Sequence, residues 1–322
     1  MATYILRRLI QTVVVVILLS YVCFYIMTLM PGDPVELMIS SNPKITSEDV
    51  ARLRTLYGLD QPAYKRYYNW VSQIAQGDLG HSRTYRVPVS ELLGPRLWNT
   101  FYLSMLALGL SLLIALPIGV YTALNPGGRL DSTINMASFF GISMPSFLLA
   151  LLLIIIFAVQ LGWLPAGGTE TIGASNEGFS GVLDRMKYLL LPVLSLSLQQ
   201  IGSFVRYARG SMLDVMRQDY VRTAKAKGLS RHIVIWKHAF RNALIPIITV
   251  VALSLSGVFS GALLTETVFA YQGVGKLVYD SIMGNDFNVA MVSFIISVSM
   301  VLVMNLIADI LYGFVDPRIT YQ

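Results

Sequence analysis

The chain has 322 residues, of which 55% are hydrophobic and 13% are charged, and its mean hydropathy is +0.62. Soluble domains carry about a quarter charged residues, so this composition excludes an ordinary soluble protein and predicts an all-α membrane protein. The net charge of +6 does not indicate a nucleic-acid partner, because basic cytoplasmic loops produce the same excess. The single cysteine, Cys23, excludes a disulfide within one copy and a thiolate metal cluster.

Six stretches are long and apolar enough to cross a bilayer as helices. In chain order they are Leu9–Met30, Thr100–Leu124, Ser132–Leu161, Tyr188–Val205, Asn242–Thr265 and Phe287–Ala308. The fourth is the most polar, which suits a helix that faces protein or a water-filled path. The first is longer than the apolar run of a signal peptide and no A-x-A cleavage site follows it, so we expect a retained helix.

The distribution of charge predicts that both termini are cytoplasmic. Arg7 and Arg8 precede the first span, and 206–241 holds nine basic residues against two acidic ones, whereas 266–286 holds one lysine against three acids. The predicted organisation is an N-terminus with the first helix (1–30), an external subdomain (31–99), a five-helix core (100–313) and a cytoplasmic tail (314–322). The core includes a cytoplasmic loop, 206–243, between the fourth and fifth spans.

The first external segment has two features of its own. Thr46-Ser47-Glu48-Asp49 is typical of a helix N-cap with acidic residues in the first turn, and predicts a helix over Ser47–Leu56. An aromatic segment follows. Its side chains, which suit either the lipid headgroups or the inside of a small subdomain, are Tyr64, Tyr67, Tyr68 and Trp70.

The cytoplasmic loop predicts a short helix over Tyr220–Lys227 that Gly228 ends, and a second helix over Ser230–Arg241 that leads into the fifth span. The small residues Ala224, Ala226 and Gly228 would let another protein approach the backbone, and the basic side chains beside them would supply hydrogen-bond donors. The charges alone favour the simpler interpretation, a loop that only fixes topology.

The order of residues in this loop resembles the signature of bacterial ABC-importer permeases. The matching residues are Arg222-Thr223-Ala224, Gly228 and Leu244-Ile245-Pro246. The sequence of this motif is most similar to that of the dipeptide, oligopeptide and nickel class. Further matches run along nearly the whole chain: Pro31-Gly-Asp-Pro34, Gly77-Asp-Leu-Gly80, Met144-Pro-Ser-Phe147, Leu164-Pro-Ala-Gly167, Thr265-Glu-Thr-Val-Phe269 and Asp316-Pro-Arg-Ile319. Each motif is weak by itself, and together, in this order, they are strong.

This resemblance implies a permease subunit in the bacterial inner membrane that forms half of a translocation path for peptides or a related small solute. Its implied partners are a second homologous permease, two cytoplasmic ATPase subunits and an extracytoplasmic solute-binding protein that contacts 31–99. ATP and Mg²⁺ would bind the ATPase subunits, so this chain would be neither an enzyme nor a cofactor carrier. The alternative function is a stand-alone secondary transporter or channel, for which the loop pattern would be coincidence.

The same resemblance implies that the loop contains a coupling helix which docks on the ATPase. The implied coupling residues are Asp219, Tyr220, Arg222, Thr223, Ala224, Lys225, Lys227, Gly228 and Leu229. Arg222 stands where the broader family has a glutamate that pairs with the ATPase, so that ion pair does not carry over. Asp219 and the loop backbone are the candidates to replace it.

Polar residues inside the spans are candidates for the translocation path, although such residues also join helices to one another. The candidates are Gln199, Gln200, Ser203, Ser254, Ser256 and Ser260, with Asn305 and Asp309 in the last span. We expect Glu266 at the external mouth. Gly273-Val-Gly-Lys276 lacks the Ser/Thr of a phosphate loop, and the three histidines lack ligand spacing, so we predict no catalytic residues and no metal site.

Overall fold

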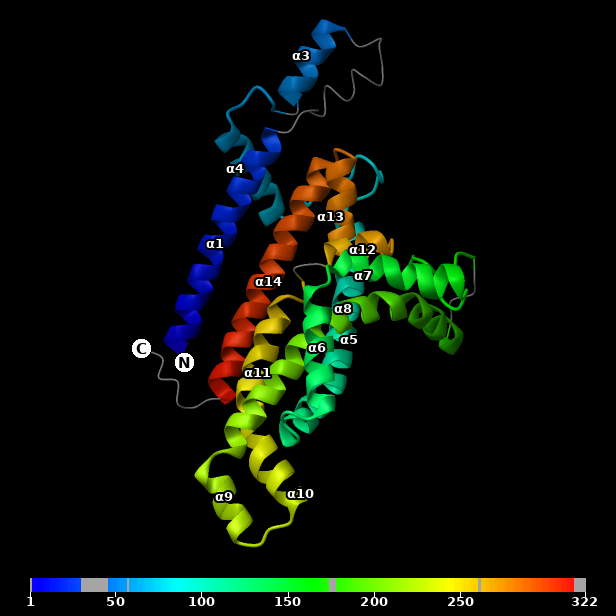
Figure 1. Cartoon of the computed structure of the whole chain (residues 1–322). Helices are drawn as coiled ribbons and strands as arrows, with labels where there is room; N and C mark the ends of the chain where they lie inside the picture. The colour runs from blue at the N-terminus through cyan, green and yellow to red at the C-terminus, as the bar shows by residue number, and fades with distance from the viewer. Residues whose placement is uncertain (1, 30–45, 57, 174–177, 260–261, 316–322) are drawn as a thin grey trace.

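The computed structural model (Figure 1) describes residues 2–29, 46–56, 58–173, 178–259 and 262–315. The regular elements within these ranges are helices, as the composition predicts, and one isolated antiparallel bridge joins His81 to Pro88. In chain order the helices are α1 (Ala2–Thr28), α3 (Ser47–Leu56), α4 (Ala63–Ala75), α5 (Val89–Leu124), α6 (Arg129–Ser143), α7 (Ser146–Leu153), the π-helix η1 (Ile154–Gln160), α8 (Gly178–Met216), α9 (Asp219–Ala226), α10 (Arg231–Ile233), the π-helix η2 (Val234–Phe240), α11 (Arg241–Ser256), α12 (Leu263–Val268), α13 (Val274–Met283) and α14 (Phe287–Val315).

Five helical segments are long and apolar enough to cross a membrane: Leu6–Thr28, Val89–Leu124, Gly178–Met216, Arg231–Leu255 and Phe287–Ile310. The sixth candidate is the pair α6 and α7–η1, bent by 102° at the intervening break. The six-span, all-helical prediction is therefore confirmed, but the expectation of one continuous third span was wrong. The physical reason is Pro145, because a residue before proline is driven out of the α region, and Met144 is extended with ψ 125°.

The centre of the bundle is the pair α5 and α8, which pack along each other. Their backbones approach closely because Gly119 lacks a side chain, and a Cβ atom built there would lie 2.5 Å from Cβ of Ala208. The α8 span is the most polar in the sequence. In its most apolar stretch of 18 residues, 44% of the residues are buried, compared with 6% in the corresponding stretch of α1. Polarity along the sequence thus indicated the inner helix, since polar residues in a span are retained where they face protein.

Helix α1 lies at the periphery, alongside α14 and in contact with α4 (Figure 1). The hydroxyls of Ser20 and Tyr67 are 2.6 Å apart, and the rings of Tyr67 and Trp70 pack on Phe24. Tyr64 and Tyr68, by contrast, are exposed. Two of the aromatic side chains, Tyr67 and Trp70, therefore pack inside the protein, and the other two are exposed.

The N-cap of α3 is confirmed, since the Thr46 hydroxyl accepts a bond from Asp49 N at 3.3 Å and Thr46 N donates to the Asp49 carboxylate at 3.0 Å.

Farther along the chain, α5 already begins at Val89, inside the range predicted to be external. In the segment just before α5, Ser82 Oγ and Thr84 N donate hydrogen bonds to the Asp286 carboxylate, at 2.5 Å and 3.0 Å respectively. Segment 77–88 is thereby attached to the turn between α13 and α14.

Candidate functional site

The loop between the fourth and fifth spans, predicted to be cytoplasmic, folds as two short helical pieces joined by a tight turn. Helix α9 ends at Ala226, Gly228 adopts the left-handed conformation with φ +73°, and Gly228 N donates to the Lys225 carbonyl at 3.0 Å. A glycine after the last turn closes a helix in this way because it has no Cβ to clash. Ser230 then accepts a bond from Ile233 N at the start of α10. The predicted helix, stop and second helix are all present.

One face of α9 is buried against the rest of the loop. Val221 and Ala224 are the buried residues of the helix, and they pack with Val234 of η2 and with Val215 and Met216 at the end of α8. Ala224 is therefore small because α9 lies close to its own chain. Its predicted part in admitting a partner does not fit its inward position.

The opposite face of α9 and the turn after it are exposed. The remaining implied coupling residues all lie there: Asp219, Tyr220, Arg222, Thr223, Lys225, Lys227, Gly228 and Leu229. Arg222 Nη1 is 3.6 Å from Asp219 Oδ1, with both side chains largely exposed. Such a surface pair contributes less than about 1 kcal/mol, so the guanidinium remains available to an acidic group on another surface. The exposed face is cationic, with two partly exposed apolar side chains, Tyr220 and Leu229.

The loop is joined to the membrane helices by an apolar cluster. Its buried members are Val120 and Ala123 of α5, Met212 of α8, Ile235 and Ala239 of η2 and Ala243 of α11. Ser211 Oγ also donates to the Ala243 carbonyl at 2.7 Å. Since α9 packs on η2 and on the end of α8, this cluster connects α9 to the ends of three spans.

A partly buried ion pair between α6 and α8 was not found from the sequence. Arg209 of α8 donates two hydrogen bonds of 2.7 Å to the Asp131 carboxylate at the start of α6. Asp131 also accepts from Gly127 N at 2.9 Å and from Asn135 Nδ2 at 2.7 Å. The available signal was a pair of opposite charges, each at the boundary of a predicted span, where an ionised side chain requires a partner.

Two of the predicted path residues line a common cleft. This cleft of about 190 Å³ lies between α5, α8 and α11, and Gln200 and Ser254 face it together with Ser104, which the sequence did not single out. Ser111 Oγ donates to Gln200 Oε1 at 3.2 Å, and Ser104 Oγ donates to the Val258 carbonyl at 3.0 Å. The cleft thus combines uncharged hydrogen-bonding groups with an apolar wall of Leu108 and Leu196.

The other path candidates lie elsewhere. Gln199 Nε2 donates to the Met144 carbonyl at 3.2 Å, so this side chain satisfies the backbone at the break between α6 and α7. Ser203 is half-buried and is not among the residues that line the cleft. Ser256 is the last residue of α11, and its side chain, like all of Ser260, lies outside the described residues.

Glu266, predicted at an external mouth, is a fully buried side chain in α12. Its carboxylate accepts bonds from Thr100 Oγ1 at 2.7 Å and from Lys276 N at 3.0 Å. Burial raises the pKa of this carboxyl, while the bonds from Thr100 and from the backbone of Lys276 and Gly275 act in the opposite direction. The carboxylate therefore joins α12, α13 and α5, and its assignment to a mouth stays a prediction.

The helical bundle, its broken third span and the outward-facing basic helix are features of a membrane transport permease. Residues 115–321 match the family described as the binding-protein-dependent transport system inner membrane component, and residues 1–89 match the N-terminal region of such membrane components. The chain belongs to this family of ABC-importer permeases.

Relatives match along the entire chain. The oligopeptide transport system permease protein AppB of Bacillus subtilis is 41% identical over 322 residues, and the di/tripeptide transport system permease protein DppB of Pseudomonas aeruginosa is 36% identical over 341 residues, each with 100% of both chains covered. A solved structure of the inward-facing MetNI methionine ABC transporter is similar in fold, with a TM-score of 0.58 at 17% identity over 70% of this chain and 97% of that chain. Among the described residues no group of three or more His, Cys, Asp or Glu side chains could hold a metal ion.

Proposed function

We propose that this chain forms half of the translocation path of a peptide importer and that the exposed face of α9 docks on a cytoplasmic ATPase subunit. The observation that carries the proposal is the two-sided character of α9, which presents Arg222, Lys225 and Lys227 outward and packs Val221 and Ala224 against the ends of the spans. A docked ATPase would act on the exposed face, and the buried face would pass the displacement to α5, α8 and α11. ATP and Mg²⁺ belong to that partner.

The size of the cleft supports a path shared by two permeases. Ligand pockets occupy roughly 300 to 1,000 Å³, and the cleft beside Gln200 and Ser254 offers about 190 Å³. A second permease facing it would complete the cavity. Its uncharged lining suits peptides, since serine and glutamine can bond a peptide backbone without selecting for the charge of its side chains. The names of the two relatives, oligopeptide and di/tripeptide permeases, agree with this substrate class.

The orientation that completes the proposal places both termini and α9 in the cytoplasm and 31–99 outside, where a solute-binding protein delivers the peptide. The alternative, a stand-alone secondary transporter, leaves the exposed basic face of α9 without a partner. The two functions are separated by whether uptake depends on an ATPase.

A charge reversal on α9 tests the docking. We expect Arg222→Glu combined with Lys225→Glu to lower both the copurified ATPase and ATP-driven peptide uptake in proteoliposomes by about tenfold or more, because like charges across an interface are strongly unfavourable. Lys187→Glu, an exposed change in α8 that lies outside both α9 and 31–99, is the matched control. Full copurification and uptake in the double variant would exclude docking through this face.

Gly228 offers a second, sharper test. Any bulky residue there is strained by φ +73°, so loss of activity in a valine or tryptophan variant does not distinguish strain from a blocked surface. Asparagine tolerates this backbone conformation, whereas valine does not. Retained uptake with Gly228→Asn and lost uptake with Gly228→Val would assign Gly228 to the turn. Loss of uptake in both variants, with folding intact, would assign it to the docking surface.

A further inference from the structure

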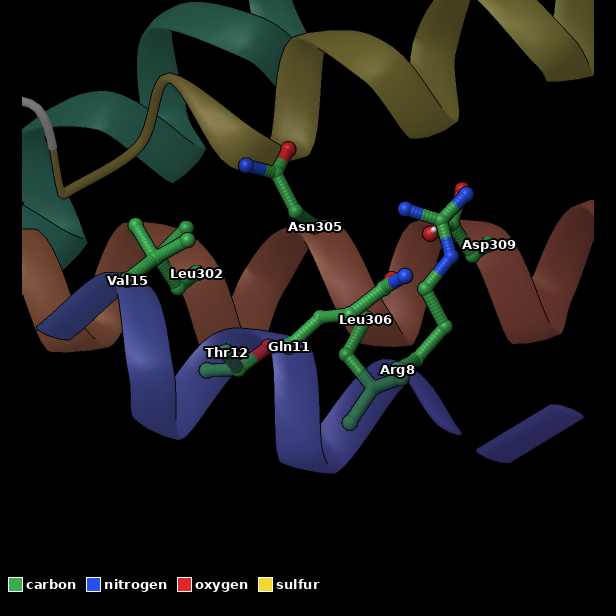
Figure 2. Close-up of a pocket in the computed structure, with 8 residues that line it drawn as sticks. All are labelled: Arg8, Gln11, Thr12, Val15, Leu302, Asn305, Leu306 and Asp309. Atoms are coloured by element: carbon green, nitrogen blue, oxygen red, sulfur yellow. Dashed lines mark ion pairs between the residues drawn. The ribbon is translucent and has the colours of Figure 1, made fainter. Parts of the chain in front are cut away.

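A second cleft lies between the peripheral helix α1 and α14 (Figure 2). Its volume is about 440 Å³, and both of its walls are membrane-spanning helices. The two helices run in opposite directions, so Arg8 lies opposite Asp309 and Val15 lies near Leu302 (Figure 2). The cleft is separate from the one beside Gln200, and it contains Asn305 and Asp309, two predicted path residues that the transport function proposed above does not use.

The lining changes in polarity along the cleft. Arg8 and Asp309 are at one end, Gln11 and Asn305 are in the middle, and the far end is apolar (Figure 2). The eight residues from Arg8 to Val15 cover about 10 Å of helix. Charged groups, amide groups and hydrocarbon thus follow one another in the order found in a phospholipid, from headgroup through ester linkages to acyl chain.

The charged end has room for a ligand. Arg8 Nη2 and Asp309 Oδ2 are 3.4 Å apart, with side chains 46% and 30% exposed. A charge-assisted N–H···O bond is typically about 2.7 to 2.9 Å long, so this pair is not tightly closed, and each side chain keeps exposed surface that a ligand can reach. The pair has no net charge, and it presents a cation for a phosphate and an anion for an ammonium group.

The position in the bundle fits a lipid. Arg8 lies near the start of the span Leu6–Thr28, and Asp309 lies at the end of the span Phe287–Ile310. Charges at span ends lie at the level of the headgroups. Only 6% of the most apolar 18-residue stretch of α1 is buried, so a lipid can enter the cleft sideways from the bilayer. Pockets between spans that carry basic residues are recognised sites for lipid headgroups.

We propose that this cleft binds a phospholipid whose headgroup carries both a phosphate and a primary ammonium, as phosphatidylethanolamine does. Arg8 donates to the phosphate, Asp309 accepts from the ammonium, and Gln11 and Asn305 donate to the ester oxygens. A quaternary ammonium headgroup has no N–H to donate to Asp309, and an anionic glycerol headgroup has no cation for it. The bound lipid fastens α1 to α14 on the side of the bundle that carries α9.

The test is native mass spectrometry of the full permease assembly, delipidated in detergent and titrated with phosphatidylethanolamine, phosphatidylglycerol or phosphatidylcholine of the same acyl chains. We expect wild type to prefer phosphatidylethanolamine by about tenfold, the effect of one hydrogen bond to a charged group. Asp309→Asn should remove this preference while phosphate binding remains. Arg8→Gln should weaken phosphatidylethanolamine and phosphatidylglycerol alike. Arg7→Gln, an exposed neighbour outside the lining, should change nothing.

Because Asp309→Asn is scored by its ratio between lipids, partial unfolding, which lowers all binding together, does not imitate the result expected for that variant. Equal binding of the three lipids, or an unchanged ratio in Asp309→Asn, overturns the proposal. Competition by soluble phosphoethanolamine at the concentrations effective for the lipid shows a soluble ligand and overturns the lipid assignment. Unchanged lipid binding with loss of the second permease in Arg8→Gln shows a helix interface and overturns it also.

Discussion

The two ends of the bundle are held together by different kinds of contact. At the end with α12 and α13, the carboxylates of Glu266 and Asp286 bond to segments distant in sequence, reaching Thr100 and Ser82 at 2.7 and 2.5 Å. At the opposite end, α9 is held by Val221 and other apolar residues, and its charged side chains face outward.

The difference indicates what each end can do. A buried polar group that loses its partner is costly, so the α12–α13 end has one favoured arrangement. Apolar contacts are not directional, so α9 can shift on η2 without leaving polar groups unpaired. Substitutions at the first end should therefore affect folding stability, and substitutions at α9 should mainly affect the coupling of transport to ATP.

The largest effect is expected for Glu266→Ala. The change leaves Thr100 Oγ1 and the backbone N–H groups of Lys276 and Gly275 without their acceptor, at a cost of about 3 kcal/mol or more. The melting temperature in detergent should fall sharply, and little folded protein should be recovered. Glu266→Gln keeps one acceptor oxygen and should be intermediate. A melting temperature equal to wild type in the alanine variant would contradict the contrast between the two ends.

The same carboxyl gives a pH dependence. Burial raises its folded pKa above the unfolded value of about 4.3, so its stabilising contribution is complete below the unfolded value and is lost as the pH rises through the folded pKa. The stability advantage of wild type over Glu266→Gln should accordingly shrink as the pH rises. Thermal unfolding of both proteins across a pH series measures this difference, and a constant difference would show that the carboxyl titrates normally.

Asp131 should show the next largest effect, and it confines the contrast to α9 itself, because it forms a polar contact near the α9 end. Asp131→Ala leaves Arg209, whose side chain is 25% exposed, without its two hydrogen bonds. Loss of one member of a buried pair costs about 3 kcal/mol. Asp131→Ala combined with Arg209→Met should recover part of the melting temperature, since both charges are then gone. No recovery would indicate that the backbone bond from Gly127 dominates.

Several of these features could be read from the sequence because they depend on local rules. The helix α9, the stop at Gly228 and the cap at Thr46 each follow from a few adjacent residues. The number of spans follows from length and polarity. The break at Pro145 was also local, but an apolar run on both sides of it suggested a single helix.

The remaining features depend on contacts between distant segments. The burial of Glu266 requires Thr100 to lie beside it, and no local pattern shows this pairing. Gln199 and Gln200 are adjacent in sequence, yet one bonds the Met144 carbonyl and the other lines a cleft, since neighbouring residues on a helix point about 100° apart. Polarity inside a span marked this region as important without separating the two roles.

A smaller effect on stability is expected for Val221→Ala, the change that separates coupling from folding. It opens a small cavity between α9 and η2, worth about 1 to 2 kcal/mol locally. Hydrogen exchange in α9 should accelerate and ATP-driven uptake should fall, while the ATPase activity of the assembly continues. Val182→Ala on α8, where the side chain is 57% exposed, is the matched control. Uptake and ATPase activity that fall together would indicate lost docking rather than lost transmission.

The smallest effect is expected at α3, where the contacts are local. Thr46→Ala removes the hydroxyl that accepts from Asp49 N and donates to the Asp49 carboxylate at 2.7 Å, a loss of about 1 kcal/mol for a cap. Amide exchange in α3 should increase while the melting temperature of the bundle stays constant. Thr55→Ala, which removes only a bond to the Ala51 carbonyl within the helix, is the control.

The same bonds lower the pKa of the Asp49 carboxyl, chiefly through the Thr46 side chain. Protection of α3 should therefore persist above the usual aspartate value of about 3.9 and be lost as the pH falls through the lower, folded value. In Thr46→Ala this dependence should largely disappear. If exchange in the bundle instead followed exchange in α3, then α3 would be part of the rigid α12–α13 end, and that end would extend beyond segment 77–88.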